Sequence, residues 1–137
     1  MRLVGSGSGS IGLADLRFEA MGAPPLNSAV LTSGSALAPT NAANPCFGLD
    51  SGTQSFALDG LRCAVQGVLR HGVRSSDSFG DIGVTTNGWG SPNGFFNFSA
   101  FTAGTTRHFQ IIGRDDAGAT CMTGQTTSQA VSVTFGG

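Results

Sequence analysis

Few residues of this chain are of the types that carry out catalysis, and they are widely spaced. The sequence holds two histidines, His71 and His108, and one glutamate, Glu19. Hydrolysis needs a nucleophile beside an oriented base, or two carboxylates that face each other across a cleft. No motif brings such a set together, and Asp115 and Asp116 fall in a polar turn where solvation explains them. We therefore expect no enzymatic activity and assign no catalytic residues.

Two carboxylates are the candidate metal ligands. Asp77 and Asp81 flank a glycine turn at Gly80, and closely spaced carboxylates of this kind can bind a hard cation such as calcium. The EF-hand pattern is not met because its closing glutamate is absent, and turn residues alone often produce such a spacing. Calcium is therefore the weaker interpretation of this loop, and the sequence predicts no other cofactor.

The single tryptophan, Trp89, lies between two glycines in the irregular stretch 75–94. An indole ring on such a loop can stack on the face of a sugar, and Asn87, Asn93 and Asp81 could complete a glycan site. The alternative is that the ring folds back and closes one end of the hydrophobic core. Glycan binding and core packing are both open for Trp89 at this stage.

The three cysteines lack the spacing of a zinc site, because no two of them form a CxxC pair and no histidine lies at ligand distance in the sequence. One disulfide and one spare thiol are the favoured interpretation, which points to an oxidising, extracellular location. A bond between Cys63 and Cys121 would join the longest predicted strand to the segment before the last one. A bond between Cys46 and Cys63 would close a smaller loop, and both pairings stay open.

The elements that must position these residues have the patterns of strands. The chain contains 22 glycines, only 11% charged residues and no stretch with the apolar spacing of an amphipathic helix. On the predicted strand 106–114, Phe109 and Ile111 face one way and Gln110 the other; the valines of 128–135 alternate in the same manner. These two strands are predicted to close one hydrophobic core.

Earlier segments show the same alternation. The segment 10–20 is predicted as a half-buried strand with Leu16, Phe18 and Ala20 inward, and further strands are predicted at 27–32 and 54–58. The longest predicted strand, 61–74, keeps its alternation through Gly67, so no bulge is required. It should place Arg62, Arg70 and Arg74 on one face and His71 on the apolar face as a hydrogen-bonded core residue.

At 137 residues the chain fits a single domain. We predict an all-β antiparallel sandwich, Ig-like or jelly-roll-like, over residues 11–137, preceded by an extended Gly/Ser-rich segment at 1–10. A net charge of −1 leaves no basic surface for nucleic acid, and the apolar runs are too short to span a membrane.

A family resemblance covers nearly the whole chain. It resembles a β-module common in secreted bacterial proteins of the planctomycete and myxobacterial kind, and the segments that carry it are SGSIGLADLRFEAMGAPP (8–25), LDGLRCAVQGVLRHGVRSSD (58–77), GWGSPNG (88–94), FTAGTTRHFQIIGRDD (101–116) and CMTGQTTSQAVSVTF (121–135). That module usually lies at or near the C-terminus of exported proteins. The resemblance implies an extracellular, non-catalytic module and transfers no catalytic residues.

These observations favour a structural module at the cell surface that forms a homo-oligomer or polymer, such as a fibre assembled by strand addition at an open sheet edge. The joint residues would be Leu3, Val4 and Ile11 in the N-terminal segment, or Phe95 and Phe101 in the Phe-rich segment. The alternatives are a carbohydrate-binding or adhesion module, with a glycan as partner, and a C-terminal sorting domain of an exported protein.

Overall fold

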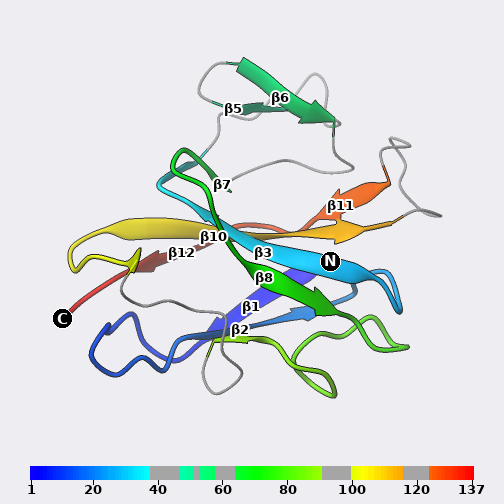
Figure 1. The fold of residues 1–137 in the computed structure, drawn as a ribbon, viewed down its shortest axis with the longest axis horizontal. Helices are drawn as coiled ribbons and strands as arrows, with labels where there is room; N and C mark the ends of the chain where they lie inside the picture. Colours follow the sequence, from blue (N-terminus) through cyan, green and yellow to red (C-terminus); the bar gives the residue numbers. More distant parts are fainter. Residues whose placement is uncertain (38–46, 51–52, 58–63, 91–99, 116–123) are drawn as a thin grey trace.

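The computed structural model describes residues 1–37, 47–50, 53–57, 64–90, 100–115 and 124–137 (Figure 1). This part of the chain holds twelve strands and no α-helix, which confirms the predicted all-β fold. The strands are β1 (Arg2–Ser6), β2 (Arg17–Met21), β3 (Ser28–Gly34), β4 (Ala36–Leu37), β5 (Phe47–Asp50), β6 (Thr53–Ala57), β7 (Ala64–Val65), β8 (Leu69–Ser75), β9 (Trp89–Gly90), β10 (Thr106–Arg114), β11 (Gln125–Thr127) and β12 (Val131–Thr134).

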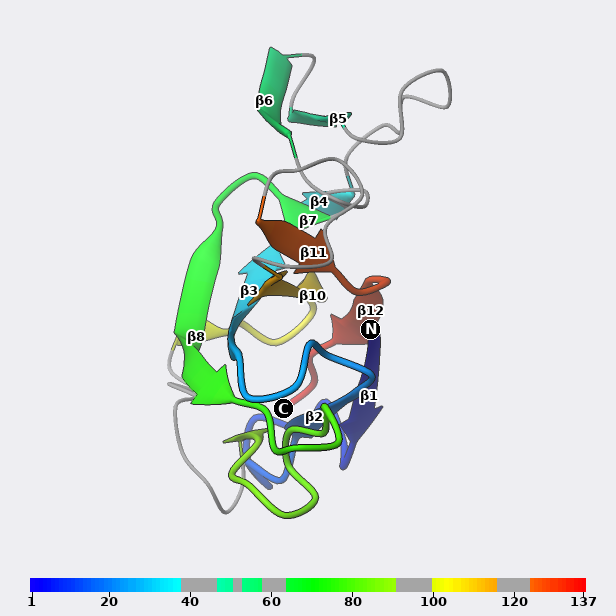
Figure 2. The same ribbon diagram turned by 90° about the vertical axis from the view of Figure 1, so that its right-hand side faces the viewer.

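Two antiparallel sheets form the sandwich. One has the order β1-β2-β9, and the other has the order β11-β10-β3-β8 with β12 also paired to β10. Figure 2 shows β1 and β2 on one side and the sheet that contains β3 and β10 on the other. Two short pairs, β4 with β7 and β5 with β6, are separate from these sheets in the described part of the chain.

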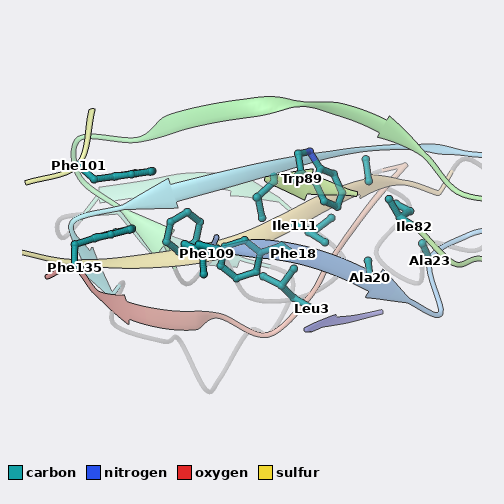
Figure 3. Packing of buried hydrophobic residues seen from close by; sticks show 13 residues of the cluster. Leu3, Phe18, Ala20, Ala23, Ile82, Trp89, Phe101, Phe109, Ile111 and Phe135 are labelled. Atoms are coloured by element: carbon teal, nitrogen blue, oxygen red, sulfur yellow. The ribbon is translucent and has the colours of Figure 1, made fainter. Parts of the chain in front are cut away.

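The hydrophobic core lies between the sheets because each contributes one apolar face. The predicted strand 10–20 is shorter in the structure, because residues 11–16 are not extended and β2 begins at Arg17, but Leu16, Phe18 and Ala20 are buried and Arg17 is exposed, as the alternation predicted. Phe18 meets Phe109 of β10 at a ring-centroid distance of 4.6 Å (Figure 3). A contact of this kind adds to the free energy that burial of the two rings already contributes.

Phe101 belongs to this core. Its ring is buried and stacked on that of Phe135, with centroids 4.3 Å apart and planes 6° apart. Phe109 meets both rings edge-on at 6.0 and 6.3 Å. The suggestion that Phe101 is free to form a joint with another subunit is therefore wrong, because its apolar surface is already covered within the chain.

The predicted strand 61–74 is interrupted. Gln66 and Gly67 have φ values of 58° and 52°, so two successive residues lie in the left-handed region and interrupt the extended backbone. The chain therefore turns between β7, which pairs with β4, and β8, which pairs with β3. Apolar alternation does not report φ, which is why the sequence predicted continuity through Gly67.

A bulge then shifts the faces of β8. Arg70 pairs with Thr32 and Val73 pairs with Val30. Between these two pairs β8 moves on by three residues while the antiparallel β3 moves by only two, so β8 contains one extra residue. The extra residue lies near Gly72, whose φ is 97°. Arg70 and Val73 consequently share the outer face of the sheet, although they are three residues apart.

The bulge also separates two of the arginines that were expected on one face. Arg74 follows Val73 and so points to the opposite side from Arg70, where its Nε donates a hydrogen bond of 2.8 Å to the Gly88 carbonyl oxygen. The expected arginine face is therefore wrong for this pair. Arg62 lies outside the described residues.

Strand β10 has the bounds that its sequence predicted, but Gln110 does not face solvent. Its side chain is fully buried, since β7 covers this part of the outer face. Gln110 Oε1 accepts a hydrogen bond from the Ala64 amide at 3.4 Å, and Nε2 donates to the Ser128 carbonyl oxygen at 2.8 Å. Both ends of the amide are thus satisfied, as a buried polar group requires.

The predicted N-terminal segment includes a strand of the sandwich. Residues 2–6 form β1, which pairs with β2 along its whole length. Leu3 is buried, Val4 is half-buried, and Ile11 is partly buried against the core. The boundary expected at residue 10 therefore does not separate a free segment from the domain.

Candidate functional site

A buried polar cluster joins β3, β8 and β10. Ser33 Oγ lies 2.8 Å from His71 Nε2, and Arg107 Nε donates a hydrogen bond to the same oxygen at 2.9 Å. Arg107 Nη2 also donates to the carbonyl oxygens of Ser33 at 3.0 Å and of Gly67 at 2.6 Å. Ser33, His71 and Arg107 are called the buried cluster below.

Strand register brings the three residues of the buried cluster together. Ser33 pairs with Phe109 of β10 on one side and with Leu69 of β8 on the other. Arg107 and His71 lie two residues from these partners along their strands, and alternate residues of a strand share a face. The three side chains therefore converge on the core side of one end of the sheet.

The environment of His71 keeps its ring neutral. Removal from water lowers the pKa of His71 to about 4, and the positive charge of Arg107 acts in the same direction. The ring also contacts Phe101 and Phe109 at centroid distances of 5.8 and 5.5 Å. Because Arg107 can only donate to Ser33 Oγ, the Ser33 hydroxyl is free to donate its own hydrogen to His71 Nε2.

The buried cluster has the spacing of a nucleophile and its base but not the accessibility. A serine hydroxyl 2.8 Å from an imidazole nitrogen is at the distance used in covalent catalysis. Ser33 has no exposed surface, however, and its oxygen already accepts a hydrogen bond from Arg107. His71 is thus confirmed as a hydrogen-bonded core residue, and the geometry supports a structural role for all three side chains.

Asp77 organises the loop in which calcium was considered. Its Oδ1 accepts hydrogen bonds from the amides of Phe79 at 2.8 Å and Asp81 at 2.9 Å, and its Oδ2 accepts one from the Thr85 hydroxyl. These bonds, the one from Thr85 foremost, hold the pKa of Asp77 below its ordinary value. Among the residues that the structure describes, no three His, Cys, Asp or Glu side chains gather as metal ligands. The geometry therefore supports a loop-stabilising role for Asp77.

Trp89 is a core residue. Its side chain has no exposed surface and lies among the core residues (Figure 3). Its Nε1 donates a hydrogen bond of 2.8 Å to the Gly72 carbonyl oxygen at the bulge of β8. A sugar can stack only on an exposed ring face. The interpretation of Trp89 as a sugar-stacking residue is therefore wrong, and the alternative of core packing is confirmed.

Five of the predicted site residues lie outside the described residues. They are Asn93, Phe95 and the three cysteines, Cys46, Cys63 and Cys121. The two disulfide pairings, Cys63 with Cys121 and Cys46 with Cys63, stay predictions.

Large apolar side chains are exposed on loops at both ends of β2. At the end that follows β2, the loops 21–27 and 76–84, called the end loops below, carry Leu26 and Phe79, which are 76% and 82% exposed. At the end that precedes β2, Leu13 is 70% exposed. Phenylalanine and leucine side chains at such exposure leave apolar surface that burial in an interface would stabilise.

Hydrogen bonds hold the two end loops side by side. The Ala23 amide donates to the Gly80 carbonyl oxygen at 2.9 Å, and the Leu26 amide donates to the Asp77 carbonyl oxygen at 3.1 Å. Gly80 has a φ of 83°, and a Cβ there would stand 2.2 Å from the Ala23 carbonyl oxygen. The exposed side chains of this end are therefore presented by a closely fitted scaffold.

The outer edge of β1 is closed by a side chain. The Leu3 amide donates to Gln129 Oε1 at 3.1 Å, and Gln129 Nε2 donates to the Leu3 carbonyl oxygen at 2.6 Å. Farther along, the Gly136 amide donates to the Gly9 carbonyl oxygen and the Ile11 amide donates to the Gly136 carbonyl oxygen. Nothing in the sequence pattern singled out Gln129, because a glutamine before a strand is ordinary.

Comparisons with protein-family models, with curated proteins and with solved structures found no match. The class of this protein therefore rests on its antiparallel β-sandwich and on the sites described above. In the described part of the chain, no helix has both the length and the hydrophobicity needed to cross a bilayer. The resemblance to a module of exported bacterial proteins stays a prediction.

Proposed function

We propose that this chain is a non-enzymatic structural module outside the cell or on its surface, and that it associates with copies of itself. The observation that carries the proposal is the exposure of Phe79, Leu26 and Leu13 on loops at opposite ends of one strand. Surfaces at opposite ends of a subunit can form head-to-tail contacts, which extend into a filament when the rotation between copies does not close a ring.

The side chains that could have done chemistry support this proposal by what they bind. Ser33, His71 and the partly exposed Arg107 form hydrogen bonds with one another and with the main chain, and Asp77 binds the amides of its own loop. The polar side chains described above stabilise the scaffold, while the large exposed side chains at its ends are apolar.

Glycan binding is the weaker candidate. The residue on which it depended, Trp89, is buried. A sorting role has no structural observation in its favour. Self-association thus keeps the first place among the three functions considered.

The experiment is to measure mass by light scattering and to look for filaments by electron microscopy over a wide range of protein concentration. We expect species larger than the monomer at high concentration, with weaker association for Phe79→Ser. Removing one buried phenylalanine contact from each interface weakens binding by roughly 2 kcal/mol, which is about a thirtyfold increase in Kd.

The matched control is Val73→Ser. Val73 is also an exposed apolar residue, at 58%, but it lies on the outer face of β8 and not on the end loops. This variant should associate like the parent protein. A parent protein that remains monomeric at every concentration would contradict the proposed function.

A further inference from the structure

We propose that β1 is exchanged between copies of this chain, so that β1 of one copy occupies the place of β1 in the sandwich of another. The proposal rests on the self-association proposed above and names the element that links the copies. Exchange of an identical element is a low-cost route to association because both copies keep the same contacts.

The attachment of β1 is the first argument. Its main chain pairs with one strand, β2, and Leu3 is its only side chain in the hydrophobic core. At the outer edge of Leu3, the side-chain amide of Gln129 supplies the two hydrogen bonds that a neighbouring strand would otherwise supply. Releasing β1 therefore requires the exposure of Leu3 and of the part of Met1 that packs on the core, together with the loss of the ladder to β2 and of the two hydrogen bonds to Gln129.

The shape of the vacated site identifies its occupant. A Cβ placed on Gly5 would stand 2.9 Å from Cε1 of Phe18, which is too close for any residue except glycine unless the ring moves. The site thus accepts a strand with a large apolar residue in the position of Leu3 and no side chain two residues later. The segment of sequence RLVGS meets both conditions, so the fitting partner is a second copy of this chain.

The connection between β1 and β2 is suited to serve as the hinge. Leu16 at its end stays in the core, and residues 7–15 can span roughly 30 Å when extended, enough to reach a neighbouring copy once the hydrogen bonds of Gly9 and Ile11 to Gly136 are released. In the closed form, Asp15 Oδ1 accepts hydrogen bonds from the Ser8 amide at 3.0 Å and the Ser8 hydroxyl at 2.7 Å. These exposed bonds hold the loop folded back on itself, so weakening them favours exchange.

A cysteine pair tests where β1 lies. Val4 and Glu19 are cross-strand partners of β1 and β2, and the Cα atoms of such partners are roughly 5 Å apart, within the range of a disulfide. The double variant Val4→Cys/Glu19→Cys is assembled at high concentration, oxidised and analysed on a denaturing, non-reducing gel. Exchange predicts covalent dimers and higher species, because each bond then joins two chains.

The matched control is Thr106→Cys/Thr134→Cys. These residues are partners of β10 and β12, which stay in one chain, so their bond should give monomers from the same assembled sample. The parent protein and the single variants, oxidised in parallel, measure the background from the native cysteines. If Val4→Cys/Glu19→Cys folds poorly, the exposed partners Arg2 and Met21 provide a second pair across the same two strands.

The outcomes separate the two proposals. Covalent dimers and higher species from the Val4/Glu19 pair, with only monomers from the Thr106/Thr134 pair, support strand exchange. A larger dimer fraction for Asp15→Asn than for the parent protein supports the assignment of the β1–β2 connection as the hinge. Assembled protein that yields only monomer bands, or equal covalent oligomers from both pairs, overturns exchange and leaves self-association standing. Absence of any assembly overturns both.

Discussion

Lowering the pH from about 7.5 to about 5 should destabilise the fold through His71. The pKa of His71 is lowered to about 4 in the folded protein, against an ordinary value of 6.5. Below pH 6.5 the unfolded chain binds a proton that the folded chain excludes, so stability falls as the pH falls. These two pKa values correspond to a loss in the free energy of unfolding of roughly 2 kcal/mol at pH 5, rising to about 3 kcal/mol below pH 4.

The physical reason is that an imidazolium at this position would be a charge removed from water and placed near a second cation. Arg107 is already a cation, and the rings of Phe101 and Phe109 keep water away from the imidazole. Protonation of Nε2 would also replace the hydrogen bond that His71 accepts from Ser33. The folded state therefore resists the proton until the pH is near 4.

Urea unfolding monitored by the fluorescence of Trp89, which is buried in the core, measures this effect. The parent protein should lose stability between pH 7.5 and 5, whereas His71→Gln should be less stable at pH 7.5 but nearly independent of pH in that interval. His108→Gln, which removes the second histidine, is the matched control for the loss of an imidazole.

Two results would refute this reasoning. One is a free energy of unfolding that stays constant for the parent protein between pH 7.5 and 5. The other is a pH dependence that survives in His71→Gln. Hydrogen bonds lower the pKa values of Asp15 and Asp77 from an ordinary 3.8, so the stability that these two carboxylates contribute is lost at a pH more acidic than this interval.

Two further changes test the core and the end loops. Trp89→Phe removes the hydrogen bond to the Gly72 carbonyl oxygen and part of a fully buried ring, so the free energy of unfolding should drop by roughly 2–4 kcal/mol in urea titrations. Gly80→Ala should cost more than Gly104→Ala. Both glycines have a φ near 83°, but only at Gly80 does a Cβ strike backbone, and equal melting temperatures for the two variants would contradict that account.

Local patterns predicted the elements whose geometry is regular. The alternation of Phe109 and Ile111 located β10 to the residue, and that of Leu16, Phe18 and Ala20 identified the buried face at β2. In such strands one residue in two points inward, so a single sequence carries the information.

The rest depended on geometry that a pattern does not contain. The turn at Gln66 and Gly67 and the bulge near Gly72 each change which side chains point inward, yet neither interrupts the apolar alternation. Ser33 and His71 are 38 residues apart, and only the register of β3 with β8 makes them neighbours. Gln110 is buried because β7 crosses its face, which is a fact of tertiary structure.

The small pair formed by β4 and β7 has a consequence for how this chain can change. Ala36 pairs with Val65 and Leu37 with Ala64, so residues 37 and 64 are neighbours in space. A segment whose two ends are already held together by strand pairing can be lengthened, shortened or replaced with little cost in loop-closure entropy. The segment between β4 and β7 is therefore the natural place for evolution to diversify this module, and for a designer to graft a foreign sequence onto it.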